Sequence, residues 1–343
     1  MKFYEIIIEP RGGSGTPLKG DTLFGHFCWQ AAYDASLING GLEHLLSLYG
    51  ESPGLIFSSA FPKLRWQGQA WYALKRPDLP SSVFPLAPGL NKIAKIKARK
   101  TQKEKKWWLL PEDLRLDFSA ARFMTDQELL QETDAAATEA GRGLRQRAEE
   151  VRVAVSRAQP HNTINRLSGT TGEGQFAPYT QKMQHYFPGL KLAIFVLLEE
   201  NITDIPRVYR ALEAIGAWGF GKDASIGQGR FAVLGWRELA WPDASEADAA
   251  YALAPSVPAP GSYQQVFFAP FIRFGKHGDI YARSGQPFKN PVLMADEGAV
   301  FFNRDRSGFS RPYLGAAVRN LSKALPATVM QGYTPYLPFK VEM

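Results

Sequence analysis

A glycine-rich segment near residue 220 is the part of this chain best suited to hold an anion. It spans residues 219–231 and reads Gly-Phe-Gly-Lys-Asp-Ala-Ser-Ile-Gly-Gln-Gly-Arg-Phe. Glycine lets backbone N–H groups turn outward and approach a ligand closely. Side-chain cations and a hydroxyl would add phosphate contacts, so the candidate residues are Gly219, Gly221, Lys222, Ser225, Gly227, Gly229 and Arg230. The alternative is a long hairpin or bulge without a ligand, because glycines most often answer a turn requirement.

Neither of the two common nucleotide-binding motifs fits these glycines. A Walker loop requires Gly-x4-Gly-Lys-Ser/Thr, but Gly20, which ends the segment beginning at Gly15, is followed by Asp21. A dinucleotide fingerprint requires Gly-x-Gly-x-x-Gly between a strand and a helix. Ala224 occupies the third glycine position, and the segment follows a predicted helix and precedes a predicted strand. Both nucleotide-enzyme interpretations therefore fail.

Other polar side chains are candidates for RNA contact. Lys19 lies in a glycine-rich turn before a predicted helix N-terminus, where N–H groups and the helix dipole favour a phosphate. The alternative for it is a solvated surface lysine. Arg11 follows the first predicted strand and is expected on the same RNA surface. Asp21 is expected to cap the helix, and His26 to be a core or interface histidine.

A predicted loop carries the best candidate general base of the chain beside two amides and a guanidinium. These residues are His161, Asn162, Asn165 and Arg166. A single histidine without a placed partner is weak support for catalysis. Asparagine and arginine side chains suit phosphate, sugar or base edges, so RNA contact is the better interpretation.

Residues 91–106 carry eight basic residues against one acidic residue and run into Trp107 and Trp108. Such a stretch is ordinarily a solvated face or a mobile loop. Alternatively, its cations could attract phosphates while the tryptophans stack on bases. Tryptophan pairs are more often in a core, and that is expected for at least one of these two.

The composition is that of a folded protein, with 45% hydrophobic and 21% charged residues. A length of 343 residues favours two domains. The formal net charge of +7 favours a polyanionic partner without indicating a fold. Because Cys28 is the only cysteine, an intrachain disulfide and a thiolate cluster are excluded, as expected in a reducing cytoplasm. No signal peptide or membrane span is expected.

Hydrophobic spacing predicts the elements that must position these residues. Strands are predicted at 3–9, 190–199 and 230–236, and helices from Asp21 to the glycines at 40–41 and over 205–218. The strand at 190–199 is the most apolar and is expected at the centre of a sheet. The order is compatible with a βαββαβ ferredoxin-like unit that carries a large insertion.

With these residues and elements in place, the chain resembles a known family. The pattern Gly-x-Gly-x5-Gly-x-Gly-Arg-Phe after a helix resembles the glycine-rich loop of the RAMP superfamily of CRISPR proteins. Segments 18–25, 59–62 and 160–166 resemble the first helix start, the Ser-Ala-Phe-Pro element and the His-Asn-x-Ile-x-Arg segment of one RAMP family. Segments 286–291 and 331–336 are also similar to it. That family comprises the crRNA 5′-tag-binding subunits of type III-A Csm effector complexes, which are the counterparts of the fifth Cas protein.

The resemblance implies an α+β fold of two ferredoxin-like (RRM-like) domains with a glycine-rich loop and an inserted β-hairpin thumb. The expected organisation is an N-terminal domain at 1–240, a linker at 241–262 and a smaller C-terminal domain at 263–343. The thumb candidate lies at 151–187 and the glycine-rich loop at 219–231. Residues 125–150 are expected to be a solvated helix or an insertion.

The function implied by the resemblance is that of a non-catalytic cytoplasmic subunit. It would bind the 5′ tag of crRNA, bridge the large polymerase-type subunit to the backbone RAMP subunits, and lie near target RNA in antiviral defence. No cofactor, metal or membrane partner is expected. The alternative is a metal-independent crRNA-processing endoribonuclease, in which His161 deprotonates a 2′-hydroxyl and Arg166 or Lys222 stabilises the developing charge. A third hypothesis is a basic protein-interaction module with incidental glycines.

Overall fold

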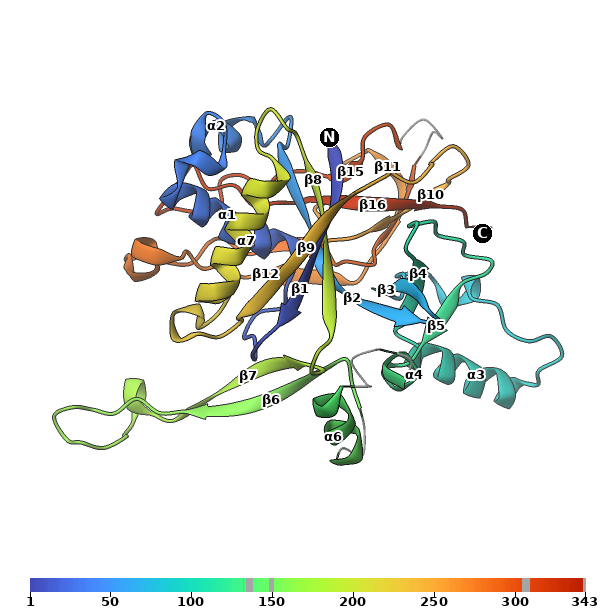
Figure 1. The fold of residues 1–343 in the computed structure, drawn as a ribbon, viewed down its shortest axis with the longest axis horizontal. Helices are drawn as coiled ribbons and strands as arrows, with labels where there is room; N and C mark the ends of the chain where they lie inside the picture. The colour runs from blue at the N-terminus through green and yellow to red at the C-terminus, as the bar shows by residue number, and fades with distance from the viewer. Residues whose placement is uncertain (132, 134–137, 148–150, 304–308, 342–343) are drawn as a thin grey trace.

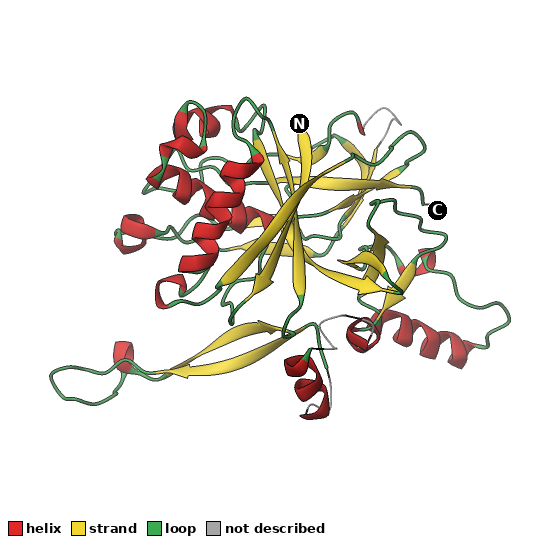
Figure 2. Cartoon of the chain, viewed as in Figure 1, coloured by secondary structure: helices red, strands yellow, loops and turns green. Residues whose placement is uncertain are grey.

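The chain is an α+β protein built around two antiparallel sheets (Figures 1 and 2). The computed structural model describes all residues except 132, 134–137, 148–150, 304–308 and 342–343. A seven-stranded sheet has the order β5-β4-β3-β2-β8-β1-β9, and a five-stranded sheet has the order β11-β14-β10-β16-β15. Two two-stranded ribbons, β6–β7 and β12–β13, complete the described strands.

The centre of the first sheet has the predicted βαββαβ order. Its strands are β1 (Lys2–Pro10), β2 (Leu55–Trp66), β8 (Lys191–Leu198) and β9 (Phe231–Leu239). The helices α1 (Gly20–Tyr33) and α7 (Ile205–Trp218) pack beside each other and over these strands (Figure 1). All the pairings β2–β8, β8–β1 and β1–β9 are antiparallel. The N-terminal half of the sequence prediction is therefore confirmed at the level of element order.

The apolar pattern of two elements explains why they occupy the centre. In β8 only Lys191 is exposed and every following residue is buried, so the strand is covered on both faces. Helix α7 starts where Asp204 accepts a hydrogen bond from the Arg207 N–H at 2.9 Å. Its inward stripe consists of Val208, Ala211, Leu212 and Ile215, as the helical spacing predicts.

The large insertion between β2 and β8 extends the first sheet. Strands β3 (Gln69–Lys75), β4 (Trp107–Pro111) and β5 (Arg122–Met124) add successively to the edge at β2. Trp108 is buried, as expected for one of the tryptophan pair, whereas the half-buried Trp107 donates its indole N–H to Asp126 at 2.7 Å. The insertion also holds the helices α3 (Lys92–Glu104), α4 (Asp126–Gln131) and α6 (Glu139–Arg147), and α2 (Gly41–Leu48) follows α1.

Residues 151–187 contain a long β-hairpin that projects from the body (Figure 1). Its strands β6 (Ala154–His161) and β7 (Tyr179–Tyr186) pair in continuous antiparallel register from Ala154 opposite Tyr186 to His161 opposite Tyr179. A loop of 162–178 joins their outer ends. The hairpin lies where the thumb is predicted.

The second sheet differs from the prediction in two ways. Its strands are β10 (Ala249–Ala252), β11 (Tyr263–Phe267), β14 (Val300–Asn303), β15 (Tyr313–Gly315) and β16 (Tyr333–Phe339). The predicted linker at 241–262 is wrong, because β10 is the buried central strand of this sheet. Its alanines do not mark flexibility; they allow close packing, and Ala254 lies directly against the start of α1.

The predicted second ferredoxin-like unit is also not seen. Apart from Phe309, the described helical residues of 241–341 are those of the 3₁₀ segment η5 (Asp279–Arg283). This segment lies between the ribbon strands β12 (Pro270–Arg273) and β13 (Val292–Ala295) in the sequence. Prolines at 255, 258 and 260 keep the connection after β10 from becoming helical. A βαββαβ unit needs two helices, and the described residues of this region form no α-helix.

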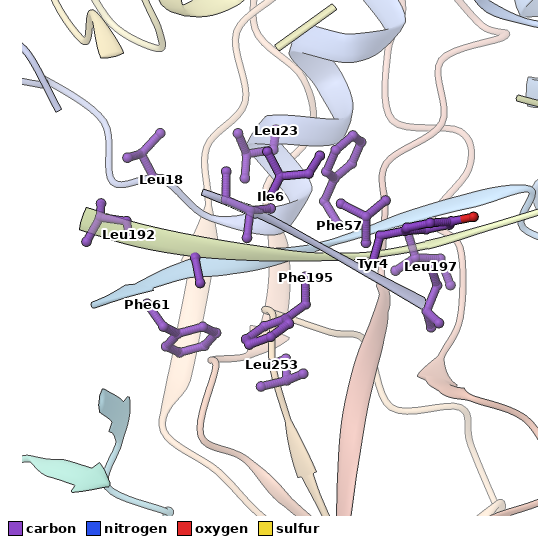
Figure 3. Packing of buried hydrophobic residues seen from close by; sticks show 14 of the residues in the cluster. Tyr4, Ile6, Leu18, Leu23, Phe57, Phe61, Leu192, Phe195, Leu197 and Leu253 are labelled. Carbon is purple, nitrogen blue, oxygen red and sulfur yellow. The ribbon is translucent and has the colours of Figure 1, made fainter. Parts of the chain in front are cut away.

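One hydrophobic core joins the two sheets. Figure 3 shows Ile6 and Leu23 on the side of α1, and Phe195, Phe61 and Leu253 on the opposite side of β8. These side chains belong to one buried cluster that also includes residues of β10, β14 and β16. The second sheet thus covers the face of the first sheet that the helices leave open.

Replacement of Gly20 tests the close approach between α1 and the second sheet. A Cβ at Gly20 would overlap the Phe57 carbonyl oxygen and lie 2.9 Å from the Ala254 Cβ. We expect Gly20→Ala to destabilise the protein by about 1–3 kcal/mol in urea unfolding, as overpacking does. Gly25→Ala is the matched control in the same helix, because nothing lies within 4 Å of its Cβ. This control should be neutral or stabilising by up to about 1 kcal/mol, and equal effects of the two substitutions would contradict the packing described.

Candidate nucleic-acid interface

The glycine-rich loop connects α7 to β9 and is held mainly by its own backbone. Gly219, Gly221, Gly227 and Gly229 all have positive φ, between 72° and 128°. A Cβ at Gly219 would lie 2.5 Å from the Gln228 carbonyl oxygen, and a Cβ at Gly229 would overlap that of Phe220. Glycine is required here because the two arms of the loop lie against each other.

The backbone N–H groups of this loop do not form the predicted open anion cradle. Phe220 N donates to the Gln228 carbonyl at 3.1 Å, and Gly229 N donates to the Gly13 carbonyl at 2.7 Å. Lys222 N donates to the Thr16 hydroxyl at 2.9 Å. Because these donors are already satisfied within the protein, they are not available to bind a phosphate.

His26 on α1 holds the glycine-rich loop through a hydrogen bond and a ring contact. Its Nε2 accepts a hydrogen bond from the Gly221 N–H at 2.9 Å, and its ring packs on Phe220 with the centroids 4.7 Å apart. The acceptor must be neutral, so its proton is on Nδ1. Burial lowers the pKa of His26 to about 4. The expectation of an interface histidine is confirmed, but its partner could not be read from the sequence.

The segment 11–16 joins the glycine-rich loop to the hairpin. Ser14 and Gln184 exchange two backbone hydrogen bonds of 2.9 Å each. Gly13 lies so close to His185 that a Cβ there would be 2.6 Å from the imidazole. We call residues 11–16, 182–185 and 219–231 together the loop–hairpin surface.

The loop–hairpin surface presents several exposed polar and cationic side chains. Arg11, Lys222, Ser225 and Arg230 are exposed there, and β7 adds exposed Lys182 and His185. Of the predicted residues, Arg11 also forms an ion pair with Glu9 at 3.2 Å. Lys182 and His185 were not predicted as site residues, because no local pattern indicates that this part of β7 pairs with residues 11–16.

The predicted group at 161–166 lies on the outer part of the hairpin. Five residues of β7 separate Gln184 from Tyr179, which places the group about 17 Å farther out. His161 stacks on Tyr179 with the ring centroids 5.4 Å apart, and Asn162 and Arg166 are exposed. Asn165 serves the turn instead: its side-chain oxygen accepts from Leu167 N at 3.0 Å.

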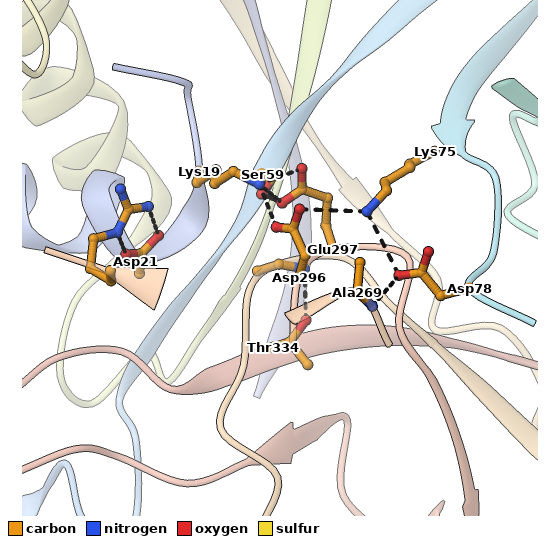
Figure 4. A network of polar contacts seen from close by, with 11 residues as sticks. Lys19, Asp21, Ser59, Lys75, Asp78, Ala269, Asp296, Glu297 and Thr334 are labelled. Atoms are coloured by element: carbon orange, nitrogen blue, oxygen red, sulfur yellow. Dashed lines mark hydrogen bonds and ion pairs between the residues drawn. The ribbon is translucent and has the colours of Figure 1, made fainter. Parts of the chain in front are cut away.

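The prediction that Lys19 contacts a phosphate is wrong for this structure. Its side chain is only 10% exposed, and its ammonium group donates to Asp296 and, at 2.6 Å, to Glu297 (Figure 4). These carboxylates lie in the turn between β13 and β14, and Lys75 lies 3.5 Å from Asp296 on the far side. Lys19 thus ties α1 to the C-terminal part of the chain.

Asp21 does not cap α1 as predicted. Residue Lys19 occupies the N-cap position, and Asp21 receives two hydrogen bonds from the Arg273 guanidinium, at 2.5 and 2.8 Å (Figure 4). The acidic residue therefore anchors the helix start to β12. Arg273 lies 252 positions after Asp21, so no local sequence pattern could predict this pair.

The described residues contain neither a metal-binding cluster nor a membrane-spanning helix. No group of three His, Cys, Asp or Glu side chains among them is arranged to hold a metal ion. No helix in the same part of the chain is long and apolar enough to cross a membrane.

Lowering the pH should weaken the contact between His26 and the loop. The pKa is about 4 in the folded state and 6.5 for an ordinary histidine, so the unfolded state binds more protons between these values. Stability should therefore fall by at most about 3 kcal/mol as the pH falls through this window. We expect His26→Gln, which keeps an acceptor but does not titrate, to remove this part of the pH dependence in urea unfolding. His277, whose pKa burial also lowers, is unchanged in the variant and contributes equally to both pH profiles. Parallel profiles of the variant and the wild type would contradict the assignment to His26.

Solved structures share the architecture of this chain. No protein-family model matches the sequence, and no curated protein matches it at a significant level. One similar solved structure is a chain of the Csm1–Csm4 cassette in complex with pppApA, with a TM-score of 0.53 and 17% identity over 100% of this chain and 99% of that chain. Another is a chain of the Csm3–Csm4 subcomplex in the type III-A CRISPR–Cas interference complex, with a TM-score of 0.55 and 12% identity over 99% of both chains. The resemblance stated from the sequence is thus confirmed at the level of the fold, which this chain shares over its whole length with subunits of type III-A CRISPR–Cas assemblies.

Proposed function

We propose that this chain is a non-catalytic subunit of a type III-A CRISPR effector complex that binds the 5′ tag of crRNA. It would act in the cytoplasm in antiviral defence. The observation that carries the proposal is the loop–hairpin surface, which presents Arg11, Lys222 and Arg230 to solvent on a backbone that internal hydrogen bonds hold rigid. The full-length similarity of the fold to chains of Csm assemblies supports it.

Binding at this surface would depend on side-chain charge and on shape. Lys222 and Arg230 suit phosphate oxygens, and Ser225 adds a hydroxyl donor. Because Gly221 and Gly229 hold the loop against α1 and residues 11–16, the cations would keep their positions when RNA binds. A preorganised surface loses less conformational entropy on binding than a mobile loop.

The β6–β7 hairpin would act as a thumb between neighbouring bases near the tag. Its end carries an exposed apolar pair, Ile164 and Leu167, of which Leu167 is 99% exposed. Apolar side chains that insert between bases are a general means of unstacking nucleic acids. His161, Asn162 and Arg166 lie beside this pair and would contact the displaced nucleotides, with target RNA nearby.

We further propose that the chain bridges the large polymerase-type subunit and the backbone RAMP subunit. Similar chains occur in structures of a Csm1–Csm4 cassette and a Csm3–Csm4 subcomplex. The ribbon β12–β13 places Ile272 opposite Leu293, and both are more than half exposed, as are Phe274 and Phe288 nearby. Exposed apolar groups of this kind are typical of protein–protein contacts.

Removal of one loop cation tests tag binding directly. We expect Lys222→Ala to weaken binding of crRNA carrying the 5′ tag, and to reduce the slope of log K against log salt by about 0.7 for the lost phosphate contact. Fluorescence anisotropy at several salt concentrations measures both quantities. Lys323→Ala removes an exposed lysine outside the loop–hairpin surface and is the matched control. Unchanged affinity and slope in Lys222→Ala would refute the site, and equal affinity for tagged and untagged RNA would refute the function.

The absence of catalysis is a separate part of the proposal. His161 Nε2 is buried and has no hydrogen-bond partner among the described residues, so none of them orients it as a base. It also lies about 17 Å along the hairpin from the level of the loop that carries Lys222. Incubation of the purified chain with repeat RNA in EDTA should therefore leave the RNA intact. Specific cleavage that disappears in His161→Ala would instead establish the endoribonuclease.

A further inference from the structure

The helix α3 is a surface element of unusual charge. None of its residues is buried, and Asn91 caps its start by accepting from Ala94 N at 2.8 Å. Polar contacts fix its orientation: Arg99 donates to the Phe84 carbonyl at 2.6 Å, and Gln102 donates to that of Pro85 at 2.7 Å. The helix is therefore held rigidly with one face outward.

The outward face of α3 carries lysines that have no acidic partner. The exposed residues are Lys92, Ile93, Lys95, Ile96, Lys97, Lys100 and Lys103. Among the described ion pairs none involves an α3 lysine, whereas Lys19, Lys63, Lys75 and Arg237 are each paired with carboxylates. Like charges three or four positions apart destabilise a helix slightly. This uncompensated repulsion would be relieved by a polyanion.

The two exposed isoleucines do not make α3 a groove-binding or membrane-binding helix. Ile93 and Ile96 are 69% and 64% exposed. Two helical turns later, the equivalent positions are Lys100 and Lys103. Helices that bind a protein groove continue their apolar anchors over positions i, i+3 or i+4, and i+7. Helices that lie in a membrane interface carry a wide apolar face with aromatic residues. The apolar stripe of α3 ends after one turn, while the cations run along its whole length.

We propose that the outward face of α3 binds the phosphate backbone of single-stranded RNA without reading its sequence. The lysines from Lys92 to Lys103 extend about 16 Å along the helix axis, enough to meet several successive phosphates. The helix and the β6–β7 hairpin both lie along the lower border of the molecule in Figure 1. The proposal rests on the proposed function for the presence of RNA, but it concerns a second contact, outside the loop–hairpin surface.

A variant of α3 with four fewer positive charges tests this contact. The variant replaces Lys92, Lys97, Lys100 and Lys103 with glutamine in the full chain, which should fold because these side chains are exposed. The probe is a fluorescein-labelled single-stranded RNA of mixed sequence without the tag, titrated at several KCl concentrations. We expect the variant to bind at least about 10-fold more weakly at low salt and to lose about 3 from the salt slope. The control Ile93→Ser/Ile96→Ser should keep the wild-type slope.

The outcomes separate this inference from the proposed function. An unchanged slope in the glutamine variant, or no binding of the mixed-sequence RNA by the wild type, would overturn the RNA contact at α3. Tighter α3-dependent binding of poly-aspartate or of phosphatidylserine vesicles than of RNA would overturn it in favour of those partners. The ratio of affinities for tagged and untagged RNA should be the same in the variant and the wild type. A ratio of one in both would refute tag recognition while leaving the α3 contact in place.

Discussion

The ion pair of buried Lys19 with Asp296 and Glu297 ties the start of α1 to the turn between β13 and β14, and it constrains how α1 meets the C-terminal part of the chain. A charge taken out of water is costly unless it is paired, so each partner holds the others in place. Burial raises the pKa of the Glu297 carboxyl, and the nearby Lys19 ammonium opposes this rise. Ser59 adds a hydrogen bond to the same carboxylate at 3.2 Å. The network thus joins the start of α1, strand β2 and the turn between β13 and β14.

The position of α1 then determines the geometry of the loop–hairpin surface. Asp21, two residues after Lys19, is held by Arg273, and His26 follows about one turn later. Because His26 accepts from Gly221, any shift of α1 would be transmitted to the glycine-rich loop. That loop in turn contacts Gly13 and Thr16, and Ser14 pairs with the base of the hairpin. The exposed residues of the loop–hairpin surface are thus positioned by the packing of the core rather than by the loop alone.

The distribution of cations divides the molecule into two classes of surface. Cations between the sheets are neutralised by carboxylates: Lys63 and Arg237 both contact buried Glu5, for example. Cations on α3 and most of those on the loop–hairpin surface face solvent. These two surfaces therefore carry part of the excess positive charge of the chain, whose formal net charge is +7, and counterion release would favour binding of a polyanion there.

Local patterns in the sequence determined the elements of the first sheet and the site of the hairpin. The apolar run of β8, the helical stripe of α7 and the glycines at 219–229 could be interpreted correctly because their causes lie within a few residues. The tertiary structure decided what could not be read in this way. Lys19 pairs with residues 277 and 278 positions away, and the alanines of β10 are buried in a strand that pairs with β14 on one side and β16 on the other. Side-chain partners brought together from distant parts of the chain turned an apparent phosphate ligand into an internal ion pair, because charge that is buried by folding must find its counter-charge inside the fold.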